Sequence, residues 1–207
     1  MADTDTVLSI RPPTRDTMPS LLAAARLIDA ITARIGRSAS WVVLAVVLIS
    51  AGNALVRKAF DLSSNAFLEI QWYLFSAMFL LAAAYTLQKN EHIRIDLISS
   101  RLSRRAQAVV DIVCTLLFLT PTCVLLVAFG WPMFVDAWVS GEMSPDAGGL
   151  IRWPVLLLIP VGFALLLAQG VSELIKRVAF LTGHGPDPLG SDQPEAAAPE
   201  QLVEERA

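Results

Sequence analysis

The sequence predicts an all-α integral membrane protein with four transmembrane helices and an N-terminal amphipathic helix in the membrane plane. Of the 207 residues, 55% are hydrophobic and only 17% are charged, whereas soluble domains carry about 25% charged residues. The charges are gathered at the two ends of the chain and in three short islands, and long uncharged stretches separate them. In lipid a backbone must satisfy its own hydrogen bonds, so these stretches are expected to be helices.

The four uncharged stretches set the expected spans. They hold 19, 19, 24 and 20 residues, and about 20 helical residues cross a hydrocarbon core of about 30 Å. We therefore expect a transmembrane domain over residues 38–178, with spans at about 38–56, 68–88, 109–130 and 153–173. A soluble bundle of buried helices is the alternative, but too few amphipathic segments remain to cover such a core.

The chain before the first span divides into two parts. Residues 1–19 are polar and contain three prolines, which predicts a disordered tail. Residues 20–37 place apolar side chains on one side of a helical wheel and Arg26, Arg34 and Arg37 on the other. We expect this segment to lie in the lipid interface. A helix packed on the protein's own cytoplasmic loop is the alternative.

Basic residues predict the orientation. Thirteen of the sixteen lie on the side that holds the N-terminus, the second loop and the C-terminus, and three lie on the other side. The positive-inside rule makes the richer side cytoplasmic. We expect both termini there, with residues 179–207 forming a disordered cytoplasmic tail.

Several polar residues stand at the ends of the spans. Glu69, Trp72 and Tyr73 open the second span, either as an interface anchor or as a contact to a partner subunit. The loop after that span carries basic residues that either meet anionic lipid or form a solvated face; they are Arg101, Arg104 and Arg105.

The third span and the outer loop contain helix breakers. Pro121 and the run Gly130-Trp131-Pro132 predict a helix that bends or breaks at the outer face. A turn-rich outer loop follows, and Asp136, Glu142 and Asp146 give that region its acidic charge.

Motifs for chemistry are few. His92 and His184 are the only histidines and lie outside the expected spans, whereas a haem-binding membrane anchor needs histidines within its helices. No charge lies in the middle of a span, where ionisable residues usually mark ion or substrate paths. We therefore expect no enzyme, no metal, no cofactor and no coupled transport site in this chain. Asn53 and Gln169 are expected to form interhelical hydrogen bonds.

Three motifs carry a family resemblance. They open the second span, follow it, and lead into the fourth span: Glu69-Ile-Gln-Trp72-Tyr73, His92-Ile-Arg94-Ile-Asp96, and Gly141-Glu-Met-Ser144-Pro145 through Trp153-Pro154 to Ile159-Pro160-Val-Gly162-Phe163. With these motifs in this order, residues 30–178 resemble the small membrane subunit, of DctQ type, of tripartite ATP-independent periplasmic (TRAP) transporters.

The resemblance implies a supporting role in the bacterial inner membrane. A large multi-span subunit would hold the substrate and sodium sites, and a periplasmic solute-binding protein would deliver an organic acid. This chain would enlarge the scaffold and help to dock the binding protein. The residues expected to contact partners are Glu69, Trp72, Tyr73, Asp136, Glu142 and Asp146. A stand-alone small carrier and a membrane anchor of a redox complex are the alternatives.

Overall fold

The computed structural model describes residues 18–60, 65–90 and 102–186. Its helices are α1 (Met18–Phe60), α2 (Asn65–Gln88), α4 (Arg104–Cys114), the π-helical turn η1 (Thr115–Leu119), α5 (Thr120–Ser140) and α6 (Trp153–Leu181). Since α4, η1 and α5 follow one another without a gap, the described residues contain four helical rods, each long and apolar enough to cross a membrane. The predicted all-α class with four membrane-length helices is thereby confirmed.

Some predictions fall outside the described residues. The loop motif His92, Arg94 and Asp96 is among them, together with Arg101 and most of the two tails. At the tail borders, α1 begins at Met18 and α6 continues to Leu181, so the helices extend slightly beyond the expected limits.

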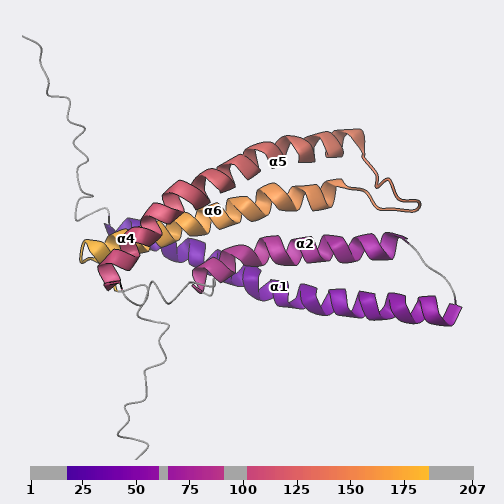
Figure 1. Cartoon of the computed structure of the whole chain (residues 1–207), viewed down its shortest axis with the longest axis horizontal. Coiled ribbons are helices and arrows are strands. Elements are labelled where there is room, and N and C mark those ends of the chain that lie inside the picture. Colours follow the sequence, from indigo (N-terminus) through magenta and orange to yellow (C-terminus); the bar gives the residue numbers. More distant parts are fainter. Residues whose placement is uncertain (1–17, 61–64, 91–101, 187–207) are drawn as a thin grey trace, which may run out of the picture.

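Helix α1 joins the amphipathic segment to the first span without a break. Its 43 residues reach about 64 Å at about 1.5 Å per residue, roughly twice the hydrocarbon thickness. Figure 1 shows α1 following the long axis of the bundle. Its first half packs on α6, where Ser172 Oγ donates to the Ala25 carbonyl at 3.2 Å. Residues 20–37 thus pack on helix α6, and their placement in the lipid interface stays a prediction.

The helices are arranged around α2 and α6. Helix α2 packs on α1 and on α6, while α5 packs on α6 (Figure 1). Near Met18 and Leu181, α1 and α4 also pack on α6, so the rods converge there. We call this the termini end of the bundle. The opposite end, where the connection between α5 and α6 lies, is the hairpin end.

Pro121 is accommodated by a π-helical turn. Proline has no N–H to continue the α-helical ladder. The ladder widens over the preceding residues, and both the backbone N–H and the hydroxyl of Thr120 bond to the Thr115 carbonyl, the hydroxyl at 2.9 Å. A single turn inside an α-helix is the form in which π-helix mostly occurs.

The break expected at Gly130-Trp131-Pro132 does not occur. Helix α5 continues through Pro132 to Ser140 and ends at Gly141, whose φ of 62° gives the left-handed C-cap that glycine favours. Gly130 lies against α6, since a Cβ atom there would be 3.1 Å from Ile159 Cγ2. This close packing on α6 supports the rod where one ladder bond is missing.

Glycines let other helices approach closely. A Cβ atom on Gly36 would overlap the side chain of Tyr85, and one on Gly162 would lie 2.7 Å from Leu80 Cβ. Small residues at such crossings are typical of membrane helices, whose association depends on packing. Gly36 therefore sets the α1–α2 distance, and Gly162 sets the α2–α6 distance.

Gly36→Ala should lower stability by about 1–3 kcal/mol, because the added methyl group overpacks against Tyr85. Gly52→Ala is the matched control, since nothing lies within 4 Å of its Cβ position and alanine favours the helix by about 0.5–1 kcal/mol. Thermal unfolding of the purified protein in detergent measures both. Equal midpoints for the two variants would contradict this packing.

Candidate functional site

The connection between α5 and α6 is a small hairpin. The Ser144 N–H donates to the Leu150 carbonyl at 2.9 Å, and the Arg152 N–H donates to the Glu142 carbonyl at 3.0 Å. Met143 and Ile151 form an antiparallel bridge between them. These bonds order the loop over residues 141–152, which we call the hairpin.

Helix α2 holds this hairpin with one row of polar side chains. The Glu69 carboxylate accepts the Leu150 N–H at 2.6 Å through Oε2 and the Ser144 hydroxyl through Oε1. The Tyr73 hydroxyl donates to the Ile151 carbonyl at 3.0 Å. Asn65 Nδ2 donates to the Ala147 carbonyl, also at 3.0 Å.

The three α2 residues are spaced four apart, so they share one face of the helix. We call Asn65, Glu69 and Tyr73 the clamp. A carboxylate that accepts a backbone N–H forms one of the stronger hydrogen bonds in proteins. The clamp therefore ties the hairpin to the start of α2, which is 75–82 residues earlier in the chain.

Gly149 allows this close approach. A Cβ atom at this position would lie 2.6 Å from Glu69 Oε1 and 2.5 Å from Ser144 Cβ. Real Cβ contacts are longer, so a side chain here would push the hairpin away from the carboxylate. Gly149 is thus required by close packing as well as by the turn.

Trp72 does not take part in the clamp. Its side chain is 75% exposed, although it lies between Glu69 and Tyr73, which bind the hairpin. Of the residues expected to contact partners, Glu69 and Tyr73 are engaged within the chain and Trp72 is open. Within this sequence motif, Glu69 and Tyr73 bind the hairpin, and Trp72 is left exposed.

The acidic residues of the outer region are exposed. Glu142 forms an ion pair with Arg152 across the base of the hairpin, with side chains 43% and 42% exposed. Exposed pairs of this kind contribute about 0–1 kcal/mol. Neither Asp136 nor Asp146 forms an ion pair with a described residue.

A second polar site lies at the termini end. Asp29 of α1 accepts hydrogen bonds from three side chains of α6: Gln169 Nε2 at 2.9 Å, Ser172 Oγ at 2.8 Å and Lys176 Nζ at 3.2 Å. Its own carbonyl accepts from Gln88 Nε2, at the end of α2, at 2.9 Å. The interhelical bond expected for Gln169 is thus present, while Asn53 forms none with the described residues.

Ion pairs extend this site to α4. Glu173 pairs with Lys176 at 2.5 Å and with Arg177 at 2.6 Å, and Arg177 Nε donates to Asp111 at 3.1 Å. The Glu173 and Arg177 side chains are only 8% and 5% exposed. We call the following set the polar network: Asp29, Asp111, Gln169, Ser172, Glu173, Lys176 and Arg177.

Apart from the hydrogen bond of Gln169, the sequence analysis does not predict the polar network. Its α6 members recur at helical spacing, which places them on one face of the helix. That spacing was readable, but the partners on α1 and α4 are 66–147 residues away. In the sequence, Asp111 and Glu173 indicate only where uncharged stretches end, and Lys176 and Arg177 indicate only the orientation.

The basic residues expected at the lipid interface are on the surface. Arg26 and Arg37 each donate through Nε to the carbonyl four residues earlier, at 3.3 and 3.1 Å. Both guanidinium groups are thereby drawn toward the termini end, as long basic side chains do near membrane borders. Arg34, Arg104 and Arg105 are exposed as well.

Comparison with known proteins places these features in a family. Residues 46–180 match the profile of the DctQ component of tripartite ATP-independent periplasmic transporters. Over 133 residues the chain is 27% identical to the C4-dicarboxylate TRAP transporter small permease protein DctQ of Pseudomonas aeruginosa. This match covers 63% of the chain and 61% of that relative, so the chain spans less than two thirds of the relative's length. The region that matches the family profile, residues 46–180, contains the clamp, the hairpin and every member of the polar network except Asp29.

Glu69→Ala should loosen the hairpin, because the Leu150 N–H and the Ser144 hydroxyl lose their acceptor. Losing a charged hydrogen-bond partner costs about 1.5–3 kcal/mol, so amide exchange within residues 143–151 should become about tenfold faster or more. Hydrogen–deuterium exchange with mass spectrometry measures this. Asp136→Ala, which removes an exposed carboxylate without a described partner, should leave exchange unchanged. Unchanged exchange in Glu69→Ala would refute the clamp.

Proposed function

The chain belongs to the DctQ family of small TRAP transporter subunits, and from this premise we propose that it is the scaffold subunit of a sodium-coupled uptake system for an organic acid. In this proposal a large multi-span subunit binds sodium and substrate, and a periplasmic binding protein delivers the substrate. The C4-dicarboxylate named for the Pseudomonas aeruginosa relative is an organic acid, which supports this substrate class.

The observation that carries the proposal is where the charges lie. Each of the four uncharged stretches has no Asp, Glu, Lys or Arg along its length. At the stretch borders, Glu69, Glu173 and Arg177 are bound by groups of the chain itself. A solute or ion path normally needs ionisable groups facing the interior of the bundle. A scaffold needs only a stable shape.

We assign the hairpin end to the periplasm. Thirteen of sixteen basic residues belong to the other side of the bundle, which the positive-inside rule makes cytoplasmic. The hairpin then faces the binding protein. Asp136, Glu142 and Asp146 give it exposed carboxylates, and the clamp holds it in one position. A preorganised loop loses less conformational freedom on docking.

We assign the contact with the large subunit to an exposed stripe of α2. Leu68, Trp72, Phe75 and Phe79 recur at helical spacing and are 44–75% exposed. Trp72 is the largest of them and stands beside the clamp. Large aromatic side chains frequently dominate protein interfaces. Glu69 and Tyr73 then support this contact by fixing the adjacent hairpin.

Trp72→Ala should weaken copurification with the large subunit by tenfold or more, because truncating such an anchor residue typically costs about 2 kcal/mol or more. Membrane insertion should be unchanged. Phe129→Ala is the control: Phe129 is 69% exposed and belongs to α5, away from α2.

Two results would count against the proposal. Normal copurification of Trp72→Ala would remove the α2 stripe from the interface. Failure of the unmodified chain to copurify with any many-span subunit would refute the scaffold role itself.

A further inference from the structure

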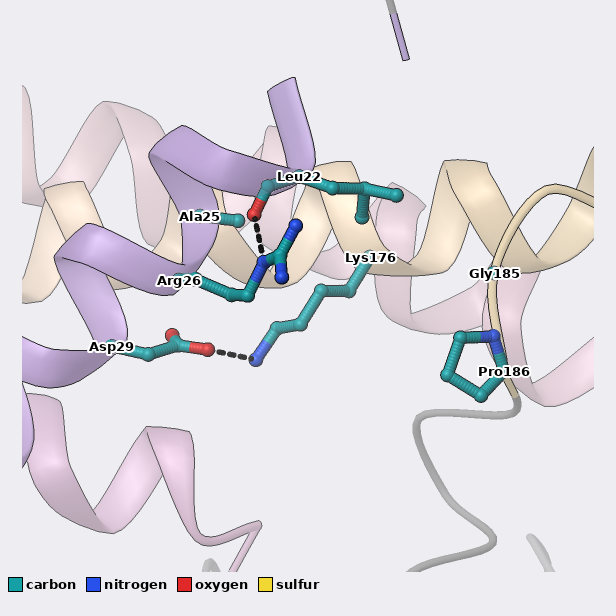
Figure 2. A pocket seen from close by; sticks show the side chains of 7 residues that line it. All are labelled: Leu22, Ala25, Arg26, Asp29, Lys176, Gly185 and Pro186. Atoms are coloured by element: carbon teal, nitrogen blue, oxygen red, sulfur yellow. Dashed lines mark hydrogen bonds and ion pairs between the residues drawn. The ribbon is translucent and has the colours of Figure 1, made fainter. Parts of the chain in front are cut away.

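A half-open pocket lies at the termini end, between the first turns of α1 and the end of α6. Its volume is about 330 Å³, which is within the lower range of small-molecule sites. Figure 2 shows Arg26 and Asp29 on α1 and Lys176 on α6 near one another, with Pro186 to their right on the segment that follows α6. Leu22 and Ala25 add an apolar wall.

The pocket lining holds two cations, Arg26 and Lys176, and one carboxylate, Asp29, so its net charge is +1. Arg26 Nε donates to the Leu22 carbonyl, and no carboxylate pairs with this guanidinium in the described part of the chain. The carboxylate of Asp29 is already bound by Gln169, Ser172 and Lys176. The Asp29 oxygens are thus occupied by donors of α6, and no ion pair joins them to Arg26 among the described residues.

Unused donors remain on both cations. A guanidinium has five N–H donors, and Arg26 uses one of them within the chain. An ammonium has three, and Lys176 uses two of them, on Asp29 and Glu173. The pocket can thus offer several charged donors to one anion without breaking the polar network.

The level of the pocket in the bundle indicates the source of that anion. Asp29 lies opposite Gln169 and Lys176, and the uncharged stretch of α6 ends between these two residues, at Ser172. This level is the border of the apolar region, where lipid phosphates lie. Basic pockets between membrane helices are known sites for anionic headgroups.

We propose that this pocket binds the headgroup of an anionic phospholipid. The phosphate is held by the guanidinium of Arg26 and the ammonium of Lys176. Leu22, Ala25 and Pro186 contact the glycerol backbone and the first carbons of an acyl chain. A bound lipid would fill the groove between the start of α1 and the end of α6 and would strengthen their contact.

Native mass spectrometry of the full chain in detergent, titrated with phosphatidylglycerol, tests this site. The unmodified protein should bind one such lipid tightly, and Arg26→Gln should lower the affinity about tenfold. Arg34→Gln is the control, because Arg34 is exposed on the same helix and does not line the pocket. Its affinity should be unchanged. Circular dichroism verifies that both variants remain folded.

Two further probes separate the possible ligands. Phosphatidylethanolamine should bind several-fold more weakly, because its ammonium group offsets the phosphate charge. Glycerol 3-phosphate, which has no acyl chains, should not displace the lipid. Equal losses in the two arginine variants, equal binding of the two lipids, displacement by glycerol 3-phosphate, or no lipid bound to the unmodified chain would each overturn the proposal.

Discussion

The ion pairs of Arg177, buried with Glu173 and partly buried with Asp111, are the contacts on which the termini end of the bundle depends. The pair with Asp111 joins α6 to α4, and Glu173, on α6 itself, extends the connection through Lys176 to Asp29 of α1. A buried charge that loses its partner costs about 3–5 kcal/mol. The helices must therefore keep their register at this end, whatever lipid or protein surrounds them.

At the hairpin end a different set of polar contacts fixes the helices and the loop relative to one another. There a single carboxylate, that of Glu69, binds the hydroxyl of Ser144 and the backbone of Leu150. Between these two ends the spans hold no Asp, Glu, Lys or Arg, and Gly36 and Gly162 lie where helices cross closely. Polar groups are thus used to hold the shape of the bundle, and the surface left for other molecules is apolar along the rods and acidic at the hairpin.

The architecture could be predicted because lipid imposes a strong rule on sequence. Charges are excluded from the spans, so Arg37, Arg57 and the other bordering charges marked the four helices. The family motifs were also readable at the span ends. The continuity of α1 could not be predicted, because an amphipathic segment followed by an apolar one is compatible with a bend or with a straight helix. Packing on α6 decides between them.

The polar sites were predictable only in part. The sequence indicates that Glu69 is a contact residue, but the groups that it binds, on Ser144 and Leu150, lie 75–81 residues later. No local sequence pattern predicts a contact between residues so far apart. Asp29 was not singled out at all, because one carboxylate among arginines on a helical wheel is typical of a solvated face. Its three α6 partners become visible only when α1 and α6 are placed side by side.

We propose that this chain is a structural subunit of a transporter and does not itself transport the solute. Sodium-dependent uptake of a labelled C4-dicarboxylate into proteoliposomes tests it most directly, with this chain alone, the large subunit alone, and both together, each with the binding protein. The account predicts no uptake above empty liposomes for this chain alone and uptake when both subunits are present. Substrate-dependent sodium flux through this chain alone would contradict it.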